Sequence, residues 1–576
     1  LAESRNQYLL ASEIPDALLF WVLCRRLPLI NEFDYAKKLY LLQRLAMLLH
    51  ASCPGRFDLP YYALTSDKTS SLLRSAPSRA FTPSDWYSRP EGYMQQLQAD
   101  FICGRYEQMW KSTARALFDG RSFPLTDHHI RALTILGSCD RAMFLFQQLY
   151  NASPYQFQLG SISNMFFMAL GSASIDQDFV RVLVGHFNEL ARQYFPSALP
   201  SLADNVPKPL SVNERPLLVV VSTDLRSHPV GRFWLPIARQ LRTKFQVISV
   251  AGHPRDADPL RDELKSLSDE WWPLEADGVS SIAERIRGLS PDLLIDLGGH
   301  TADNHPALLC HRLATVQATY LGFYGPTYAR CCDWWIVDQV LERWISKSYP
   351  GAERLWALPG PSLCYVPELH SLSDPETISY QESNYLIYGS FNHTRKLTSS
   401  TQERFGAVLS ATPDAVLQFR SHSFHDPAVR RYFLQRFSDV GISPHQLQPL
   451  PYAPSSAEAM SDYGRINLHL DSYPVSGTTT TLDSLAMGIP VLTCPTPYYA
   501  GTISAAILEH AGLADHICFD QADLPGHARW LAERFRSASA RRSLAQQVRE
   551  SAICDDEAMP LMFVEQLQQM LRQSLS

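Results

Sequence analysis

The 576-residue sequence lacks the cysteine spacing of a disulfide framework or of a zinc site. Its 11 cysteines are scattered, with Cys331 and Cys332 adjacent and no CxxC pair. Small secreted domains carry paired cysteines at short intervals, whereas cytosolic proteins keep their cysteines reduced. We therefore expect a protein of a reducing compartment, the cytoplasm.

The sequence also lacks a membrane-spanning run and an excess of basic residues. No uninterrupted apolar stretch approaches the ~20 residues that cross a bilayer. The opening LAESRNQYLL has no basic region followed by an apolar core. With a net charge of −7, the chain has no general basic excess to replace counterions on nucleic acid. We expect no membrane span and no nucleic-acid partner, although a local basic groove for a small phosphorylated ligand stays open.

Residues 1–205 have apolar side chains at the three- and four-residue spacing that predicts helices. Examples are DALLFWVLCRRLPLI, YAKKLYLLQRLAMLLHA and DRAMFLFQQLY. No clean period emerges, so a degenerate helical repeat and an ordinary α-helical domain are both open. We predict a helical domain over residues 1–205.

Near residues 205–214 the pattern changes to short β-branched runs that alternate with helical segments. PLLVVVST, FQVISVAG, DLLIDLGG and DWWIVD are typical of buried parallel strands. A looser stretch at 360–384 precedes a second series that includes YLIYGSFN, AVLQFRS, INLHLD and HICFD. The predicted fold class is α + α/β, with Rossmann-like halves at 212–375 and 385–555 and a C-terminal helix at 556–576. Ligands of such sheets bind at the carboxyl ends of the strands.

One candidate site is the stretch DSYPVSGTTTTLDSL, between a predicted strand and a predicted helix. In it Gly477 precedes a run that contains Thr478, Thr479 and Thr480. Hydroxyls and free backbone N–H groups gather at such a helix start, where the dipole favours an anion such as a diphosphate. Asp483, one turn further on, is placed to accept ribose hydroxyls. The alternative is that Thr478 only caps a core helix while the other threonines pack.

Three further strand ends carry reactive side chains. In YGSFNHTRKLTSS, Lys396 is placed to neutralise a phosphate leaving group, although most lysines are solvated surface residues. In VVSTDLRSHPVGRF, His228 is a candidate acid or base, although a lone histidine is more often structural. In LLIDLGGHTADN, paired glycines let the backbone approach a ligand, and His300 and Thr301 project beyond them.

Two stretches raise the question of a metal. Asp256 and Asp258 form a DAD tripeptide in a predicted loop, a short motif with a high false-positive risk. His422 and His425 lie in SHSFHD, but no companion ligands follow at a fixed spacing. We predict no metal site at either stretch.

Five stretches together resemble the catalytic region of the O-GlcNAc transferase family, including its SPINDLY-type branch. They are STDLRSHPV, DLGGHTADN, ATVQATYLGFYGPT, GSFNHTRKLT and LDSYPVSGTTTTLDSLAMGIPVLT, in the family's order between residues 215 and 530. Five ordered motifs are more specific than any one of them. The resemblance implies a GT-B fold and an inverting transfer of a sugar from a nucleotide diphosphate to a protein side chain, commonly Ser or Thr.

The resemblance also implies roles for residues of the second half. Lys396 matches the lysine that contacts the donor diphosphate. Thr479 and Thr480 match the phosphate-binding threonines, and Asp483 matches the acidic residue at the nucleotide ribose. His393 occupies the position of a donor-contacting glutamine in animal members.

In the first half, the resemblance matches His228 to a histidine proposed as a base or an active-site organiser. His300 and Thr301 match the glycine-rich turn near the transferred sugar. Two departures bear on the donor: Thr478 replaces a histidine of animal members, and LGFYGPT replaces LGYPGT. UDP-GlcNAc, another UDP-hexose such as UDP-glucose, and GDP-fucose therefore stay open as donors.

We predict metal-independent transfer of GlcNAc from UDP-GlcNAc to Ser or Thr of an acceptor protein, without a cofactor. Residues 1–205 resemble the compact helical domains of bacterial relatives that modify surface proteins such as flagellins or adhesins. Transfer to Asn and a catalytically decayed helical binding protein are the alternatives. Retention of Lys396, Thr479, Thr480 and Asp483 favours the enzyme.

Overall fold

The computed structural model describes residues 133–575 apart from 153, 155–156, 173–175, 195–214, 253–256, 275–278, 346, 368–377, 381–382, 426, 451–452 and 454–455. The chain divides into two compact units, residues 1–156 with 423–435 and residues 157–422 with 436–576. Most of the predicted helical domain, residues 1–132, lies outside the described residues. In the first unit, α9 (Cys139–Ala152) follows Ser138, whose hydroxyl lies 3.2 Å from that of Tyr432.

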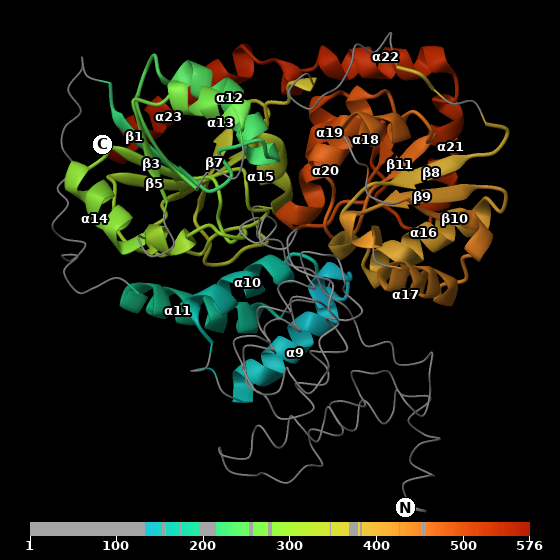
Figure 1. Ribbon diagram of the computed structural model, residues 1–576, viewed down its shortest axis with the longest axis horizontal. Coiled ribbons are helices and arrows are strands. Elements are labelled where there is room, and N and C mark those ends of the chain that lie inside the picture. Colours follow the sequence, from blue (N-terminus) through green and yellow to red (C-terminus); the bar gives the residue numbers. More distant parts are fainter. Residues whose placement is uncertain are drawn as a thin grey trace, which may run out of the picture. The chain divides into compact units, whose positions relative to one another are not determined.

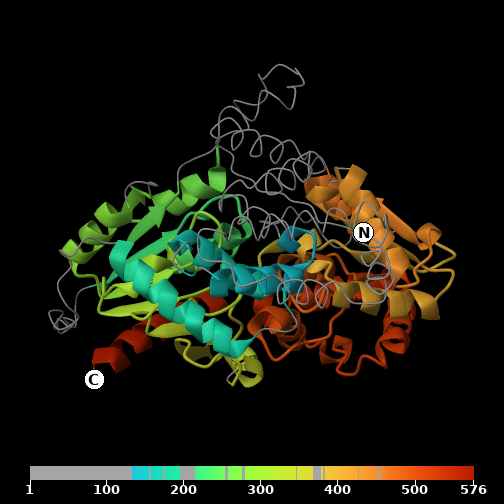
Figure 2. The same cartoon turned by 90° about the horizontal axis from the view of Figure 1, so that it is seen from below.

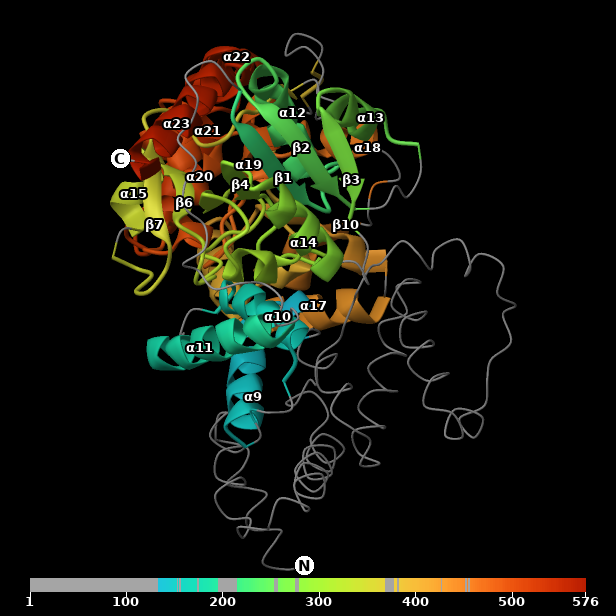
Figure 3. The same ribbon diagram turned by 90° about the vertical axis from the view of Figure 1, so that its left-hand side faces the viewer.

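The second unit contains a seven-stranded parallel sheet in the order β3-β2-β1-β4-β5-β6-β7. Figure 3 shows β1, β2 and β3 side by side. Leu218 to Val221 of β1 are all buried, as expected for a parallel strand covered on both faces. The strands are β1 (Leu217–Ser222), β2 (Gln246–Ala251), β3 (Glu270–Pro273), β4 (Leu293–Asp296), β5 (Val316–Thr319), β6 (Trp334–Asp338) and β7 (Arg354–Leu358).

The same unit contains a second parallel sheet of five strands in the order β10-β9-β8-β11-β12. Its strands are β8 (Ile387–Ser390), β9 (Val416–Arg420), β10 (Leu447–Leu450), β11 (Leu468–Leu470) and β12 (Val491–Leu492). In both sheets the chain first adds strands on one side and then crosses to the other. The order reverses between β1 and β4 and again between β8 and β11. In open α/β sheets, ligands bind outside the carboxyl ends of the strands at such a switch point.

Helices flank both sheets (Figure 1). Before and around the first sheet they are α10 (Leu159–Ala169), α11 (Gln177–Tyr194), α12 (Pro229–Leu241), α13 (Pro259–Ser266), α14 (Val279–Leu289) and α15 (Gln339–Ile345). After β8 they are α16 (Ser399–Ala411), α18 (Ser456–Tyr463), α19 (Thr479–Ala486), α20 (Tyr499–His510), α21 (Leu524–Arg534), α22 (Ala538–Arg549) and α23 (Ala558–Leu575). Helix α17 (Pro427–Asp439) begins in the first unit and ends in the second. Short 3-10 turns include η5 (Pro306–Cys310) and η8 (Thr394–Lys396).

Helices α10 and α11 belong to the same compact unit as the two sheets, although the sequence placed them in the helical domain 1–205. Figure 2 shows both helices, in blue-green, beside the green elements of the first half. The Asn188 amide of α11 donates to the Tyr328 carbonyl at 2.8 Å, and a ring nitrogen of His311 lies 3.1 Å from the Ala191 carbonyl. The predicted boundary at 205–214 lies outside the described residues, so the division into four domains stays a prediction.

The C-terminal helix α23 packs against the first half. The Phe563 ring lies 4.8 Å from the Tyr320 ring, which follows β5, and 6.1 Å from the Trp234 ring of α12. The start of α20 also meets the first half, where the ring centres of Trp335 and Tyr499 are 5.0 Å apart. Buried aromatic contacts therefore tie segments distant in the sequence into one unit.

The two predicted Rossmann-like halves are confirmed, with three differences in strands. HICFD was predicted as a strand but makes only an isolated bridge, between Ile517 and Thr493. Two strands were not predicted, β3 with the sequence EWWP and β7 with the sequence RLWAL. Both lie at the outer edges of the first sheet, where partial burial weakens the apolar pattern.

Candidate functional site

Two loops meet at the switch point of the second sheet. One follows β8 and carries Lys396; the other follows β11 and carries Gly477 just before α19. A Cβ atom on Gly477 would lie 2.4 Å from Thr481 Oγ1 and 2.8 Å from Thr480 Oγ1. Only glycine therefore lets the loop pass so close to the first turn of the helix.

Lys396 is buried at this junction, with 7 % of its surface exposed. Its ammonium donates to the Ser476 carbonyl at 2.6 Å and lies 5.6 Å from the centre of the Tyr324 ring. Burial lowers the pKa of Lys396 from 10.5 to about 7; Arg395 adds to this effect and Asp471 opposes it. An anion bound beside the ammonium would favour its charged form again.

Thr478 occupies the N-cap position of α19, but its side chain makes no capping hydrogen bond. Its hydroxyl is buried and has no hydrogen-bond partner among the described residues. The capping alternative therefore lacks its defining contact. A buried polar group without a partner is costly, so a ligand group that bonds to this hydroxyl would recover free energy.

Some of the neighbouring polar side chains are hydrogen-bonded within the protein and others are not. Thr480 Oγ1 donates to Asn392 Oδ1 at 3.0 Å, and the hydroxyls of Thr481 and Ser504 are 2.8 Å apart. Thr479, the first residue of α19, is half-buried. His469 of β11 is fully buried, and its Nδ1 has no partner among the described residues. Burial, assisted by Lys396, lowers the pKa of His469 to about 3, so its ring is neutral.

Asp483 is buried on α19 and accepts a hydrogen bond from the Tyr365 hydroxyl at 2.6 Å. Tyr365 comes from the stretch that leaves the first half after β7, and burial beside this carboxylate raises the pKa of its hydroxyl. The contact fixes the Asp483 side chain beside the switch point. Its predicted role at a ribose stays a prediction.

His228 is the N-cap of α12 in the first half. Its Nδ1 accepts a hydrogen bond from the Val230 N–H at 3.3 Å and lies 3.7 Å from Asp224 Oδ1. In the neutral ring this bond places the proton on Nε2, so Nε2 donates and does not accept. The side chain is 36 % exposed. This tautomer fits an organising donor, whereas a proton on Nδ1 beside Asp224 would leave Nε2 as a base, so the predicted role of His228 stays a prediction.

His300 is locked inside the first half, after β4. Its ring nitrogens lie 2.8 Å from Ser163 Oγ of α10 and 2.8 Å from the Thr327 carbonyl. Aromatic rings surround it, with Phe166 4.7 Å away between ring centres. Burial lowers the pKa of His300 to about 4. The next residue, Thr301, donates to the Gly298 carbonyl at 2.7 Å, which closes the turn. His300 therefore anchors α10, and the predicted sugar contact stays a prediction for both residues.

His393 begins the short turn η8 on the surface of the second half. Its Nδ1 accepts from the Arg395 N–H at 3.2 Å, and its side chain is exposed. The guanidinium of Arg395 lies 4.6 Å from the centre of the Phe167 ring of α10. The structure thus places His393 three residues before Lys396 but outside the buried cluster, and its donor contact stays a prediction.

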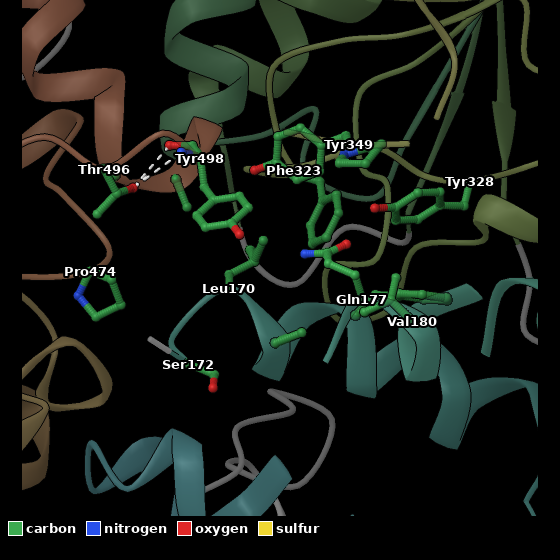
Figure 4. Close-up of a pocket in the computed structure, with 15 residues that line it drawn as sticks. Leu170, Ser172, Gln177, Val180, Phe323, Tyr328, Tyr349, Pro474, Thr496 and Tyr498 are labelled. Atoms are coloured by element: carbon green, nitrogen blue, oxygen red, sulfur yellow. Dashed lines mark hydrogen bonds between the residues drawn. The ribbon is translucent and has the colours of Figure 1, made fainter. Parts of the chain in front are cut away.

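A mainly apolar pocket, partly open to solvent, borders the junction of the two loops (Figure 4). Helices α10 and α11, the loop after β5, the loop after β11 and the start of α20 all line it. Phe323 lies next to the Tyr324 that faces Lys396, and Pro474 lies two residues before Ser476. The pocket therefore opens beside the loop that Lys396 contacts. Its other labelled lining residues are Leu170, Ser172, Gln177, Val180, Tyr328, Tyr349, Thr496 and Tyr498.

Sequence reasoning missed four residues of the site. Asn392 and Asp471 each follow a predicted strand end, a position that gave a usable signal. Tyr324 lies in the noted LGFYGPT stretch, but nothing in the sequence places it against Lys396. The contact made by Tyr365 joins residues 118 positions apart and had no local signal.

Of the candidate ligands in the two stretches considered as metal sites, the structure describes the side chain of Asp258 alone. Asp258 is the N-cap of α13, where it accepts hydrogen bonds from the Arg261 N–H at 3.0 Å and the Ser227 hydroxyl at 2.7 Å. Asp256 and the side chains of His422 and His425 lie outside the described residues. Over the described ranges, no group of three or more His, Cys, Asp or Glu side chains is arranged to hold a metal ion. None of the described helices combines the length and apolar character of a membrane span.

No known protein-family profile matches the chain. The chain is 29% identical over 352 residues to the Solanum lycopersicum protein named "Probable UDP-N-acetylglucosamine--peptide N-acetylglucosaminyltransferase SPINDLY", which covers 60% of this chain and 37% of that protein. The protein of the same name from Hordeum vulgare is 28% identical over 355 residues, with the same shares. The SEC protein of Arabidopsis thaliana is 22% identical over 305 residues, 51% of this chain and 30% of that protein. The chain thus spans little more than a third of the length of the SPINDLY relatives.

Among solved structures, a mutant of the Thermobaculum terrenum O-GlcNAc transferase has a TM-score of 0.72 at 22% identity, covering 98% of this chain and 99% of that chain. The chain has the GT-B fold. The predicted resemblance to the O-GlcNAc transferase family is confirmed.

Proposed function

We propose that the protein transfers N-acetylglucosamine from UDP-N-acetylglucosamine to Ser or Thr hydroxyls of an acceptor protein. The observation that carries the proposal is the buried Lys396 ammonium at the switch point, beside the start of α19 and the unpartnered Thr478 hydroxyl. Burial destabilises the lysine charge, and an anionic diphosphate would compensate it. The names of the SPINDLY relatives support the same donor and a peptide acceptor.

In the proposed reaction the acceptor oxygen attacks the anomeric carbon of the sugar. A carbon–oxygen bond to the acceptor forms, the bond to the diphosphate breaks, and UDP leaves with the electron pair. A single displacement of this kind inverts the anomeric centre. Lys396 and the free N–H groups at Thr478 to Thr480 are placed to stabilise the charge that develops on the leaving diphosphate. The proposal assigns this charge stabilisation to the chain's own residues and requires no metal.

The acceptor hydroxyl must lose its proton during the attack. His228 follows β1 at the switch point of the first sheet. With its proton on Nδ1, beside Asp224, Nε2 would accept a proton; with its proton on Nε2, the ring would donate. We propose His228 Nε2 as the candidate proton acceptor, with orientation of the reacting group as its alternative role. The cytoplasm, predicted from the scattered cysteines, remains the proposed location.

The test is mass spectrometry of acceptor proteins, flagellin among them, after incubation with UDP-GlcNAc, UDP-glucose or GDP-fucose in EDTA. We expect an added N-acetylhexosamine on Ser or Thr from UDP-GlcNAc alone. Added mass from another donor, or on Asn, would replace the donor or the acceptor in the proposal. Retention of transfer in EDTA is the expected sign of metal independence.

Two outcomes would overturn the proposal. Absence of transfer from all three donors, together with absence of donor binding by calorimetry, would refute an enzyme of this class. Binding of a partner polypeptide without any nucleotide-sugar turnover would favour a decayed helical binding protein.

A further inference from the structure

A buried carboxylate organises the loop that faces Lys396. Asp471 follows β11 and is 8 % exposed. Its Oδ1 accepts from the N–H groups of Gly477 at 2.7 Å and Ser472 at 2.8 Å. Its Oδ2 accepts from the Thr493 hydroxyl at 2.8 Å. Asp471 therefore closes the loop 472–477 on itself and ties it to the end of β12.

Asn392 extends this arrangement to the end of β8. It is 1 % exposed, and its Oδ1 accepts from Thr480 Oγ1 on the first turn of α19. Its Nδ2 points to Asp471 Oδ1 at 3.4 Å. Strands β8, β11 and β12 are neighbours in the sheet, so Asn392, Asp471 and Thr493 form a clamp across three adjacent strand ends. We call these three residues the strand-end clamp.

Asp471 of the clamp also acts on the charge of Lys396, which burial disfavours most. Lys396 donates to the Ser476 carbonyl, one residue before the Gly477 N–H that Asp471 holds. The groups that act on the ammonium are Arg395, which disfavours its charge, and Asp471, which favours it. His469 lies nearby but is neutral, because burial lowers its pKa to about 3. Asp471 therefore supplies the favourable charge that acts on Lys396.

We propose that Asp471 is a positioning residue for the donor: its carboxylate holds the loop 472–477 and the start of α19 in the conformation that receives a diphosphate, and its negative charge favours the ammonium form of Lys396. The inference rests on the proposed function. The clamp uses both carboxylate oxygens as acceptors, and the same carboxylate carries a negative charge that acts on Lys396. Burying a carboxylate is costly: burial raises the pKa of Asp471, and the Thr493 hydroxyl, the Lys396 charge and the Gly477 N–H oppose this effect.

The experiment measures binding of UDP-GlcNAc by calorimetry, without acceptor, between about pH 6 and about pH 9, where the donor diphosphate does not titrate and Lys396 does. In the wild-type protein, affinity falls as pH rises through the pKa of free Lys396, near 7. In Asp471→Asn the favourable charge is lost, so we expect this fall at a lower pH. At neutral pH we expect about tenfold weaker binding, the usual scale for losing a charged hydrogen-bond acceptor.

The matched control is Asp338→Asn in the first sheet. Asp338 is equally a buried strand-end carboxylate, which accepts from the Leu341 N–H at 2.8 Å and the Ser362 hydroxyl at 2.6 Å. We expect a lower melting temperature from this variant, but an unchanged pH dependence of donor binding. Comparing the two variants separates the general effect of losing a buried carboxylate from the specific effect of losing Asp471 on donor binding.

A second variant covers the case in which Asp471→Asn does not fold. Asn392→Ala removes the bond to Thr480 and leaves the Asp471 charge in place. We expect weaker donor binding with the pH dependence of the wild type. Wild-type affinity in Asn392→Ala, or an unshifted pH dependence in folded Asp471→Asn, would overturn the inference.

The readout distinguishes this inference from the proposed function. Wild-type protein that binds UDP-GlcNAc but transfers no sugar would refute the transferase and still allow Asp471 to be judged. Transfer by the wild type with unaltered binding by both clamp variants would refute only the inference. Wild-type protein that does not bind UDP-GlcNAc would overturn the proposed donor and this inference together.

Discussion

The two sheets use polar side chains differently at their switch points. In the first, both ring nitrogens of His300 are bonded within the protein, and His228 caps a helix. In the second, the Thr478 hydroxyl and His469 Nδ1 are buried without partners in the described part of the chain. The same junction holds Lys396, whose charge burial disfavours.

At the second switch point the unpaired polar groups lie beside a buried lysine. Buried polar groups are nearly always hydrogen-bonded, because each unpaired group costs about 1–3 kcal/mol. The second half carries several such costs at one place, next to a helix start that favours anions. A bound diphosphate would remove them together. In the first half, Thr223 Oγ1 directly after β1 is also buried without a partner among the described residues, but His300 there is fully bonded and holds α10.

The largest expected effect comes from Lys396→Met. We expect transfer to fall about 100- to 1000-fold, the scale for removing one charge-stabilising donor. The free protein should nevertheless melt a few degrees higher at neutral pH, because a disfavoured buried charge is removed. The checks are sugar transfer and melting temperature.

The lowered pKa of Lys396 also makes the folding stability of the wild type depend on pH. Between about 7 and 10.5 the unfolded lysine binds more protons than the folded one, so wild-type stability gains from this group as pH rises. That gain should be absent from Lys396→Met. Lys265→Met, at an exposed lysine of α13, is the control and should change neither property. Wild-type sugar transfer by Lys396→Met would contradict the assignment of the diphosphate site to the second sheet.

Thr478→Val should weaken donor binding about tenfold without lowering the stability of the free protein, because the lost hydroxyl has no partner there to lose. Thr481→Val is the matched control. Its hydroxyl is paired with that of Ser504, so we expect a loss of stability and unchanged donor binding. Calorimetry and melting curves measure both. A loss of stability in Thr478→Val with normal donor binding would restore the capping interpretation.

His300→Leu should lower the free energy of unfolding by about 1–3 kcal/mol, because Ser163 and Thr327 lose a buried partner. The pKa of His300 is about 4 in the folded protein, against 6.5 ordinarily. Between these values the unfolded state binds more protons, so this residue costs stability as pH falls from 6.5 towards 4. The variant should lose stability less steeply in that window. A marked loss of donor affinity would instead show that the first half also contacts the sugar.

The smallest effect is expected for His228→Asn. Asparagine caps helices as well as other polar residues do, so stability should stay within about 0.5 kcal/mol of the wild type. An organising residue predicts a fall in kcat of less than about tenfold, because the amide keeps a donor. A general base predicts a loss of about 100-fold or more. Steady-state kinetics with His228→Ala, which also loses the cap, separates the two contributions.

Much of the second half could be predicted because its signals are local. The apolar runs that became β8, β9 and β11, the glycine before the threonines and the helix start at Thr479 each depend on a few consecutive residues. The placement of Lys396 at a strand end likewise followed from the order of elements. The edge strands β3 and β7 were missed because they are only partly buried and their sequences lack an apolar alternation.

The sequence by itself determined the alternating strands and helices, the two halves and the short motifs at their strand ends, because propensity and burial patterns act over neighbouring residues. Only the tertiary structure decided which polar groups are satisfied. The bonds from Ser163 to His300, from Tyr365 to Asp483 and from Asn392 to Thr480 each join residues 88 or more positions apart. Such bonds depend on strand order and helix packing, which bring distant residues together and exclude water from some of them.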